Sequence, residues 1–205
     1  MAKDTKERIL ETALQMFSQN GYAGTNIREL TAALGLVKSS MYKHFESKEA
    51  IWNALLDRMI AYYGARFGSP ERLPPVPDSL ERLVGMTMEM VDFTVHDEKI
   101  VMIRKVLAIE QFRDARANAL ASKHFLTGLI RMFTPVFEGM MDRGLLKRDD
   151  PEMLAFAYTA PISALIHQCD REPEKMEEAM AGIEAFSRHF VKVYGREEQH
   201  EQGLV

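Results

Sequence analysis

Apolar residues recur at every third or fourth position along almost the whole chain, and no segment alternates convincingly between apolar and polar residues. That period is the period of an amphipathic α-helix, so the sequence predicts an all-α fold. Capping residues, glycine and proline mark where each helix begins and ends. About nine helices are expected, over residues 4–20, 25–34, 38–45, 48–67, 78–95, 97–111, 114–143, 150–170 and 172–194.

Particular residues are expected to start or bend these helices. Thr25 should cap the second helix, Ser47 the fourth and Asp78 the fifth, because their side-chain oxygens can accept hydrogen bonds from free backbone N–H groups. Pro135 should kink the long helix over residues 114–143, because proline removes a hydrogen bond from a helix interior.

A proline-rich stretch over residues 68–77 is the clearest boundary in the chain. It holds four of the eight prolines and so cannot be helical. We therefore expect an N-terminal domain over residues 1–47, a connecting helix over 48–67, a larger domain over 78–195 and a polar tail over 196–205.

The net charge of −4 is unevenly distributed along the chain. Residues 1–66 carry nine Lys and Arg against seven Asp and Glu, a balance of +2, and the remaining residues carry 17 against 23, a balance of −6. A mildly basic end on an acidic body favours contact with nucleic acid at that end. An excess of two charges could also arise by chance, so the prediction of nucleic-acid binding needs the support of a sequence motif.

Composition excludes several classes of protein. Cys169 is the single cysteine, which excludes an intramolecular disulfide framework and any multi-cysteine metal site. The N-terminus has no apolar core of a signal peptide, and the longest uncharged run, residues 153–169, is too short and too polar to span a bilayer. We expect a soluble protein of a reducing compartment.

Residues 25–48 have the pattern of a helix-turn-helix, two short helices joined by a tight turn at Gly35. At 100° per residue the second of these helices has two different faces. The apolar face, expected to pack on the two preceding helices, comprises Val37, Met41 and Phe45. The opposite face comprises Ser39, Ser40 and Lys43, with Tyr42 and His44 on its flanks.

This polar face is suited to the major groove of DNA. Small and basic side chains can reach base edges there, and longer hydrogen-bonding groups can reach the phosphates. Thr25, at a helix start, and Lys48, in the first turn after Ser47, add donors where backbone N–H groups also favour phosphate. Arg28 could reach a phosphate or the edge of a guanine.

A specific run of positions extends this motif across residues 5–60. The run comprises the helix from Ile9 to Phe17, Gly21-Tyr22, Thr25, Gly35-Leu36, Tyr42-Lys43-His44-Phe45 and Ser47-Lys48-Glu49. It resembles the DNA-binding domain of the TetR (tetracycline repressor-like) family of bacterial transcriptional regulators. The resemblance implies phosphate contacts from Thr25, Tyr42, His44 and Lys48, and positions near bases for Lys38, Ser39, Ser40 and Lys43.

Two positions depart from the family pattern. Val37 stands where a serine usually caps the third helix, and it has no side-chain acceptor. The missing cap should cost about 1 kcal/mol of helix stability. Ser39 stands where the family often has glycine, which should alter the close approach to DNA at that point.

The larger domain is rich in methionine and phenylalanine. Residues 78–194 hold ten of the fourteen methionines and eight of the eleven phenylalanines. Such residues line adaptable apolar cavities, but at helical spacing they are more often plain core, and both interpretations stay open. The family resemblance favours a cavity for a small apolar or amphipathic ligand. The candidate lining residues are Met86, Met90, Phe93, Met102, Phe112, Phe125, Leu129, Phe133, Phe137, Tyr158 and His167.

The last two helices are apolar over more than one face. A terminal helix that must bury two faces suggests a subunit interface, and the family dimerises through its last helices. The alternative is packing within a single core. The candidate interface residues are Leu154, Ile162, Leu165, Ile166, Ile183, Phe186 and Phe190.

Nothing in the sequence indicates catalysis. His167 and Cys169 lie about 200° apart around a helix and cannot chelate together, and none of the common catalytic or nucleotide-binding motifs occurs. We expect no cofactor, no metal site and no membrane contact. The expected partners are a double-stranded DNA operator, a small-molecule effector and a second copy of the chain.

The sequence therefore predicts a dimeric, ligand-controlled repressor that binds a near-palindromic operator in the bacterial cytoplasm, at the nucleoid when bound. The alternative is a helical small-molecule-binding protein or enzyme that retains the N-terminal fold without specific DNA binding.

Overall fold

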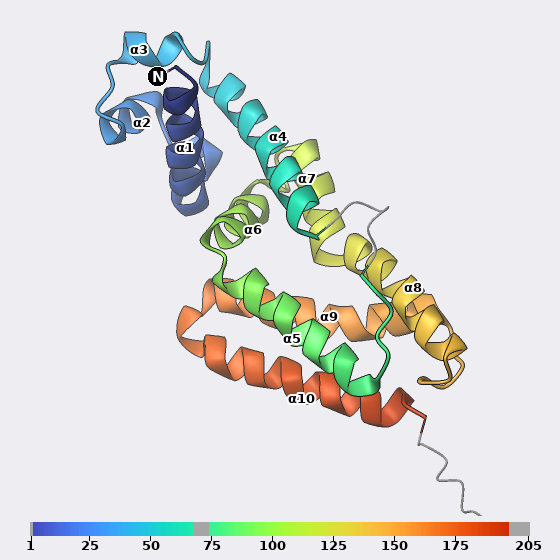
Figure 1. Cartoon of the computed structure of the whole chain (residues 1–205). Helices are drawn as coiled ribbons and strands as arrows, with labels where there is room; N and C mark the ends of the chain where they lie inside the picture. The colour runs from blue at the N-terminus through green and yellow to red at the C-terminus, as the bar shows by residue number, and fades with distance from the viewer. Residues whose placement is uncertain (1, 68–73, 197–205) are drawn as a thin grey trace, which may run out of the picture. The chain divides into compact units, whose positions relative to one another are not determined.

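The computed structural model describes residues 2–67 and 74–196, and this part of the chain is almost entirely helical (Figure 1). The predicted all-α fold is confirmed. The α-helices described are α1 (Ala2–Gly24), α2 (Ile27–Ala33), α3 (Lys38–Tyr42), α4 (Lys48–Phe67), α5 (Leu80–His96), α6 (Glu98–Glu110), α7 (Ala115–Ser122), α8 (Gly128–Asp142), α9 (Pro151–Arg171) and α10 (Met176–Tyr194).

The helices form two compact units. The first unit contains α1 to α4 together with α6 and α7, and the second contains α5 and α8 to α10; the divisions fall between residues 95 and 96 and between 124 and 125. From the proline-rich boundary, residues 96–124 were expected in the larger domain instead. They join the first unit because α6 packs along α1 and buries Ile100, Ile103 and Leu107 completely.

The core of the first unit follows the predicted apolar stripe of α1. Ile9, Ala13 and Phe17 are fully buried on it, and the regular helix is broken at Gly21, whose φ is +71°. The expected stop at Gly21 is therefore present. Trp52 of α4 is also buried.

Two of the predicted helix caps are displaced by one residue. Asn26, not Thr25, caps α2, and its side-chain oxygen accepts a hydrogen bond from the backbone N–H of Glu29. Ser79, not Asp78, occupies the capping position before α5, where its Oγ accepts from the N–H of Arg82 at 3.1 Å. Ser47 caps α4 as predicted, accepting from the N–H of Ala50 at 3.0 Å.

The predicted long helix over residues 114–143 is divided. Asp114 caps α7, but a π-helical turn, Lys123–Thr127, separates α7 from α8. Neither proline nor glycine occurs between residues 114 and 127, so apolar periodicity alone does not reveal the break. Most of the predicted proline-rich boundary, residues 68–73, and the tail from residue 197 lie outside the described residues.

The second unit is built around a cluster of aromatic side chains. In it α9 packs against both α8 and α10, and Figure 1 shows α9 and α10 side by side. Phe133, Phe137, Tyr158 and Phe190 are buried in mutual ring contact. The Tyr158 hydroxyl lies 2.8 Å from the hydroxyl of Thr87, and burial raises the pKa of Tyr158.

Candidate nucleic-acid interface

A tight turn at Gly35 fixes the position of α3 relative to α2. Gly35 has a φ of +65°, and the N–H groups of Gly35 and Leu36 donate to the carbonyls of Ala32 and Thr31 at 3.1 and 2.9 Å. These two bonds form a Schellman motif, which glycine favours because it adopts a positive φ without strain. The chain thus ends α2 abruptly and enters α3 at a defined angle.

Two apolar side chains anchor α3 to the rest of the first unit. Met41, on α3, is fully buried, and Phe45, just after α3, is almost fully buried. Both were predicted to face inward. With this side fixed, the remaining side chains of the short helix are directed away from the core.

The polar residues predicted to read DNA lie together on α3 and the turn that follows it. Lys38, Ser39, Tyr42 and Lys43 are exposed, and Ser40 and His44 are half-buried. The Lys38 ammonium lies 5.8 Å from the centre of the Tyr42 ring. Arg28 is exposed on the neighbouring helix α2. The structure therefore assembles most of the predicted DNA-binding residues on one small surface.

Val37 does not lie where the periodic pattern put it. It was predicted to pack with Met41 and Phe45, but its side chain is 67% exposed. Val37 precedes α3 with an extended backbone, φ −84° and ψ 152°, so the 100° helical spacing does not apply to it. It is the N-cap residue of α3 and makes no side-chain capping hydrogen bond, as its apolar chemistry predicted.

Thr25 is not placed for a side-chain contact with phosphate. It is 1% exposed, and its hydroxyl donates to the carbonyl of Gly21 at 3.1 Å, with that of Met16 at 3.4 Å. The hydroxyl therefore holds the turn between α1 and α2. The threonine in the motif has a structural role here, which spacing alone could not distinguish from a phosphate contact.

Lys48 lies at the start of α4 against a cluster of aromatic rings. Its ammonium is 4.2 Å from the centre of the Tyr22 ring, and Tyr22 contacts both Phe17 and Trp52. Burial lowers the pKa of Lys48, and the carboxylate of Glu110 opposes this effect. The cation–π contact orients the lysine while leaving it half-buried.

Two carboxylates that the sequence analysis did not single out as functional hold this cluster from the other side. Glu110, at the end of α6, is 3% exposed, and its Oε1 accepts a hydrogen bond from the backbone N–H of Tyr22 at 2.8 Å. Asp114 accepts from the indole Nε1 of Trp52 at 2.9 Å. Asp114 stands at the start of an expected helix, but no local pattern marks Glu110.

The charge state of Asp114 follows from these contacts. Burial would raise the pKa of its carboxyl group, but the hydrogen bond from Trp52 lowers it, as do those from the backbone N–H groups of Ala117 and Arg116. The net effect is a pKa below the usual range for aspartate. The carboxylate form is the one that accepts all three bonds.

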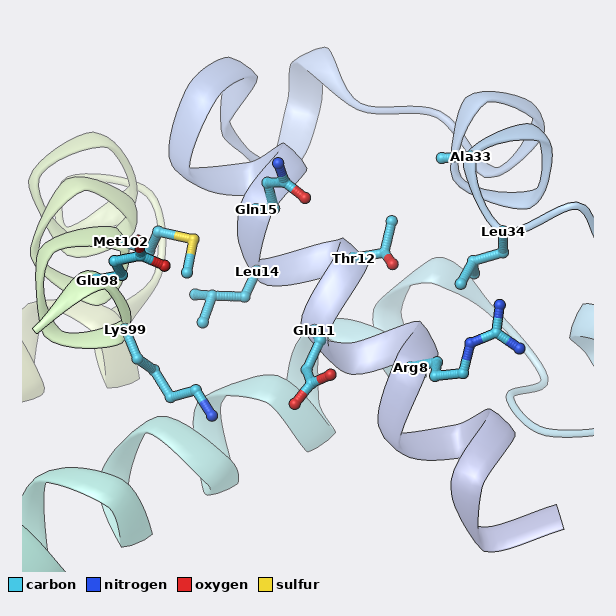
Figure 2. A pocket seen from close by; sticks show the side chains of 10 residues that line it. All are labelled: Arg8, Glu11, Thr12, Leu14, Gln15, Ala33, Leu34, Glu98, Lys99 and Met102. Carbon is cyan, nitrogen blue, oxygen red and sulfur yellow. The ribbon is translucent and has the colours of Figure 1, made fainter. Parts of the chain in front are cut away.

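A groove of about 520 Å³ lies within the first unit, along one face of α1 (Figure 2). The end of α2 and the start of α6 complete its walls. Its lining residues are Arg8, Glu11, Thr12, Leu14, Gln15, Ala33, Leu34, Glu98, Lys99 and Met102. Met102 is the one residue of this set that the sequence analysis assigned to a ligand pocket.

The other predicted pocket residues are divided between core and surface. Phe133, Phe137 and Tyr158 belong to the buried aromatic cluster of the second unit. Phe112 belongs to the first unit, as Met102 does, and is 85% exposed. The half-buried ones in the second unit are Met86, Met90, Phe93, Phe125, Leu129 and His167. Among these, the Phe125 and His167 rings are 4.3 Å apart, edge to face.

The predicted interface residues are divided in the same way. Four are buried inside the second unit and so serve its own core: Leu154, Ile162, Ile183 and Phe190. The half-buried ones are Leu165, Ile166 and Phe186. Three apolar side chains that the prediction missed are exposed on α9 and α10, namely Met153, Phe156 and Val193. Met153 and Phe156 lie outside the main apolar stripe of α9, which is why the stripe did not identify them, whereas Val193 continues the stripe of Phe186 and Phe190 on α10.

Residues 2–67 and 74–196 contain no group of three or more His, Cys, Asp or Glu placed to hold a metal ion. Among the helices that the structure describes, none combines the length and the hydropathy needed to cross a membrane.

Comparison with known proteins adds a family match at the N-terminus. Residues 9–55 match the family model described as bacterial regulatory proteins, tetR family. The chain is 31% identical over 106 residues to YerO of Bacillus subtilis, described as an uncharacterized HTH-type transcriptional regulator, covering 49% of this chain and 35% of YerO. It is 30% identical over 95 residues to the HTH-type transcriptional repressor KstR2 of Mycobacterium tuberculosis, covering 46% of each. The matched part is thus less than half the length of either relative.

Solved structures extend the similarity over the whole fold. SmeT, the repressor of the multidrug efflux pump SmeDEF of Stenotrophomonas maltophilia, has a TM-score of 0.65 to this chain, at 19% identity, over 98% of this chain and 95% of SmeT. At that identity the similarity is one of fold.

Proposed function

We propose that the chain is a TetR-family regulator, whose family model its residues 9–55 match, and that it acts as a sequence-specific DNA-binding repressor controlled by a small ligand. The observation that carries this proposal is the surface of α3. Its basic and hydroxyl side chains are presented outward, while Met41 and Phe45 fix the helix to the unit from behind.

In this proposal α3 enters the major groove. Lys38, Ser39, Ser40 and Lys43 lie near base edges, where hydroxyl and ammonium groups can bond to purine and pyrimidine atoms. The two serines are small enough to let the helix approach the bases closely. Arg28, on α2, reaches a phosphate or a guanine edge beside them.

Three further residues bind phosphates in this proposal. Tyr42 and His44 flank the reading face, and Lys48 is held at the start of α4 by the Tyr22 ring. Phosphate contacts fix the position of the protein on the duplex and contribute most of the salt-dependent affinity.

Two copies of the chain associate through α9 and α10 in this proposal. The exposed side chains of Met153 and Phe156 on α9 and of Val193 on α10 supply apolar surface, beside half-buried Leu165 and Phe186. A two-fold dimer presents two α3 helices to successive major grooves, about 34 Å apart, and so reads a near-palindromic operator.

A small apolar or amphipathic effector binds the second unit in this proposal. The half-buried ring and thioether groups of Met86, Met90, Phe93 and Phe125 offer adaptable apolar surface, and His167 offers a polar group beside Phe125. The effector controls DNA binding only through its different affinities for the DNA-bound and free conformations. The site of action is the bacterial cytoplasm.

Selection from a library of random duplexes tests the proposal. The full-length chain should enrich one near-palindromic sequence, and the affinity should fall steeply with salt because each phosphate contact releases counterions. Replacement of Lys48 by Ala should reduce the slope of log K against log salt by about 1, whereas Arg131→Ala, which also removes one positive charge but at an exposed site on α8, should leave the slope unchanged.

Absence of any enriched sequence, with weak and uniform binding, would overturn the proposal. That result would favour the alternative, a helical ligand-binding protein or enzyme that keeps the N-terminal fold without reading DNA.

A further inference from the structure

The side chain of Val37 occupies an unusual place for an apolar group. It is the N-cap residue of α3, it is 67% exposed, and its exposed neighbours on the helix are Lys38 and Ser39. Met41 and Phe45, which it was expected to join, are buried without it. Packing in the described chain therefore does not account for a valine here.

Local stability does not account for it either. Valine is among the weakest N-cap residues because it offers no acceptor to the free N–H groups of the first turn. An exposed isopropyl group also gains nothing from burial in the isolated chain. Val37 therefore departs from two local preferences, the polar side chain favoured at an N-cap and the burial favoured for an apolar side chain. Because it does so at the N-terminus of the proposed recognition helix, it is a candidate functional residue.

We propose that Val37 is a specificity-determining residue that contacts the 5-methyl group of a thymine in each half-site of the operator. The inference rests on the proposed function and deepens it by assigning one base. In a helix-turn-helix, the N-terminal residues of the second helix are the ones that meet base edges. Val37 stands at that end and directs its apolar group outward.

The chemistry of the groove selects thymine. In the major groove, the thymine methyl is the one methyl group that a base pair presents, and cytosine has only a C5–H at the same place, beside its amino donor. An isopropyl group pressed against the cytosine amino group would leave that donor without a partner. When the isopropyl group packs against the thymine methyl group, no hydrogen-bonding group on the base loses its partner, and both apolar surfaces are removed from water.

Uracil in place of thymine removes the methyl group and changes nothing else on the base edge. The test begins with the duplex that the wild-type chain enriches, in which each thymine is replaced by uracil in turn. One thymine per half-site should show a loss of affinity of about fourfold per substitution, the value of one buried methyl group. The other thymines should show no comparable loss.

Variants of Val37, measured on the thymine and uracil duplexes, complete a double-mutant cycle. With Val37→Ser the same thymine and uracil duplexes should bind equally well, because a hydroxyl replaces the apolar partner of the methyl group. With Val37→Ala, which keeps only the apolar Cβ, the difference between the two duplexes should shrink. Ile60→Ser, the matched loss of an exposed β-branched residue on α4, should keep the fourfold difference.

Thermal stability separates this role from a structural one. Serine is a good N-cap, so Val37→Ser should raise the Tm of the protein while it abolishes the preference for thymine. Val37→Ala supplies no cap and should reduce the preference with no such gain in Tm. If Val37 had only a structural role, each substitution would change the affinities for the thymine and the uracil duplex by the same factor. That change in affinity would have the same direction as the change in Tm.

The outcomes distinguish the two proposals. If the wild-type chain enriches no sequence, the proposed function fails and this inference fails with it. If a sequence is enriched but no uracil substitution weakens binding, or if the uracil penalty persists in both Val37 variants, this inference alone is overturned.

Discussion

The carboxylate of Glu110, at the end of α6, accepts a hydrogen bond from the backbone N–H of Tyr22, 88 positions earlier in the chain. The bond is 2.8 Å long, and Glu110 is almost fully buried. It ties α6 to the break in α1 that precedes the helix-turn-helix. Because the ring of Tyr22 in turn supports Lys48, this carboxylate helps to hold a proposed phosphate-binding residue in place.

Removal of this carboxylate should destabilise the first unit. Glu110→Ala leaves the Tyr22 N–H without its partner, so we expect a loss of about 2 kcal/mol in the free energy of unfolding. Glu110→Gln keeps a carbonyl acceptor at the same distance and should lose less than half of that. Denaturant unfolding measures both, and equal losses for the two variants would show that the hydrogen bond is not the stabilising element.

Gly21 should tolerate no side chain. Its φ of +71° disfavours L-residues, and an added Cβ would lie 2.9 Å from Oε1 of Glu110. We expect Gly21→Ala to cost about 2 kcal/mol of unfolding free energy. Gly64→Ala is the control, because it lies inside α4 with no atom near the added Cβ and should stabilise the chain by about 1 kcal/mol. A stabilising effect at both positions would contradict the described break in α1.

His124 should make the protein sensitive to mild acid. It stacks on the Tyr63 ring with the ring centres 3.7 Å apart, and burial, with a smaller effect from Lys123, lowers its pKa to about 4. In the unfolded chain the pKa is near 6.5, so the unfolded state binds the proton first. The stabilisation is complete above pH 6.5 and is lost as the pH falls from there toward 4.

The contribution of His124 is isolated by comparison with His124→Phe. Between pH 7.5 and pH 5 the wild-type chain should lose about 2 kcal/mol of unfolding free energy more than the variant. The other titrating groups are common to both proteins and cancel in the difference. A constant gap across this pH range would mean that His124 keeps its ordinary pKa in the folded protein.

Two residues on α3 and its end should affect DNA binding in different ways. Lys43→Ala should relax the preference at one base position, at a cost of about 1–3 kcal/mol on the preferred sequence. Tyr42→Phe should weaken binding to all sequences alike, because the hydroxyl is assigned to a phosphate. Repeated duplex selection with each variant measures both effects. An unchanged enriched sequence with Lys43→Ala would remove that residue from the reading surface.

Much of the first unit was accessible from sequence because its signals are local. The stripe of Ile9, Ala13 and Phe17, the turn at Gly35 and the inward Met41 depend on spacing along one or two helices. Such patterns identify a helix and its buried face without information from the rest of the chain. The same holds for the polar surface of α3.

The errors share a physical cause, which is dependence on contacts or geometry beyond one helix. The buried position of Thr25 depends on the carbonyl of Gly21, and the role of Glu110 depends on a partner 88 positions away. Val37 was placed inward because a helical angle was applied to a residue that precedes the helix. In the second unit, helical periodicity could not distinguish a residue buried in the core of the unit, such as Leu154, from a residue exposed for contact with a second chain.

The central claim is that this chain reads a DNA sequence through α3. The most direct measurement compares its affinity for the selected duplex and for a scrambled duplex of the same composition over a series of salt concentrations. The account predicts that both affinities fall as salt rises and that the selected duplex binds at least about 10³-fold more tightly at physiological salt. Equal affinities at every salt concentration would contradict it.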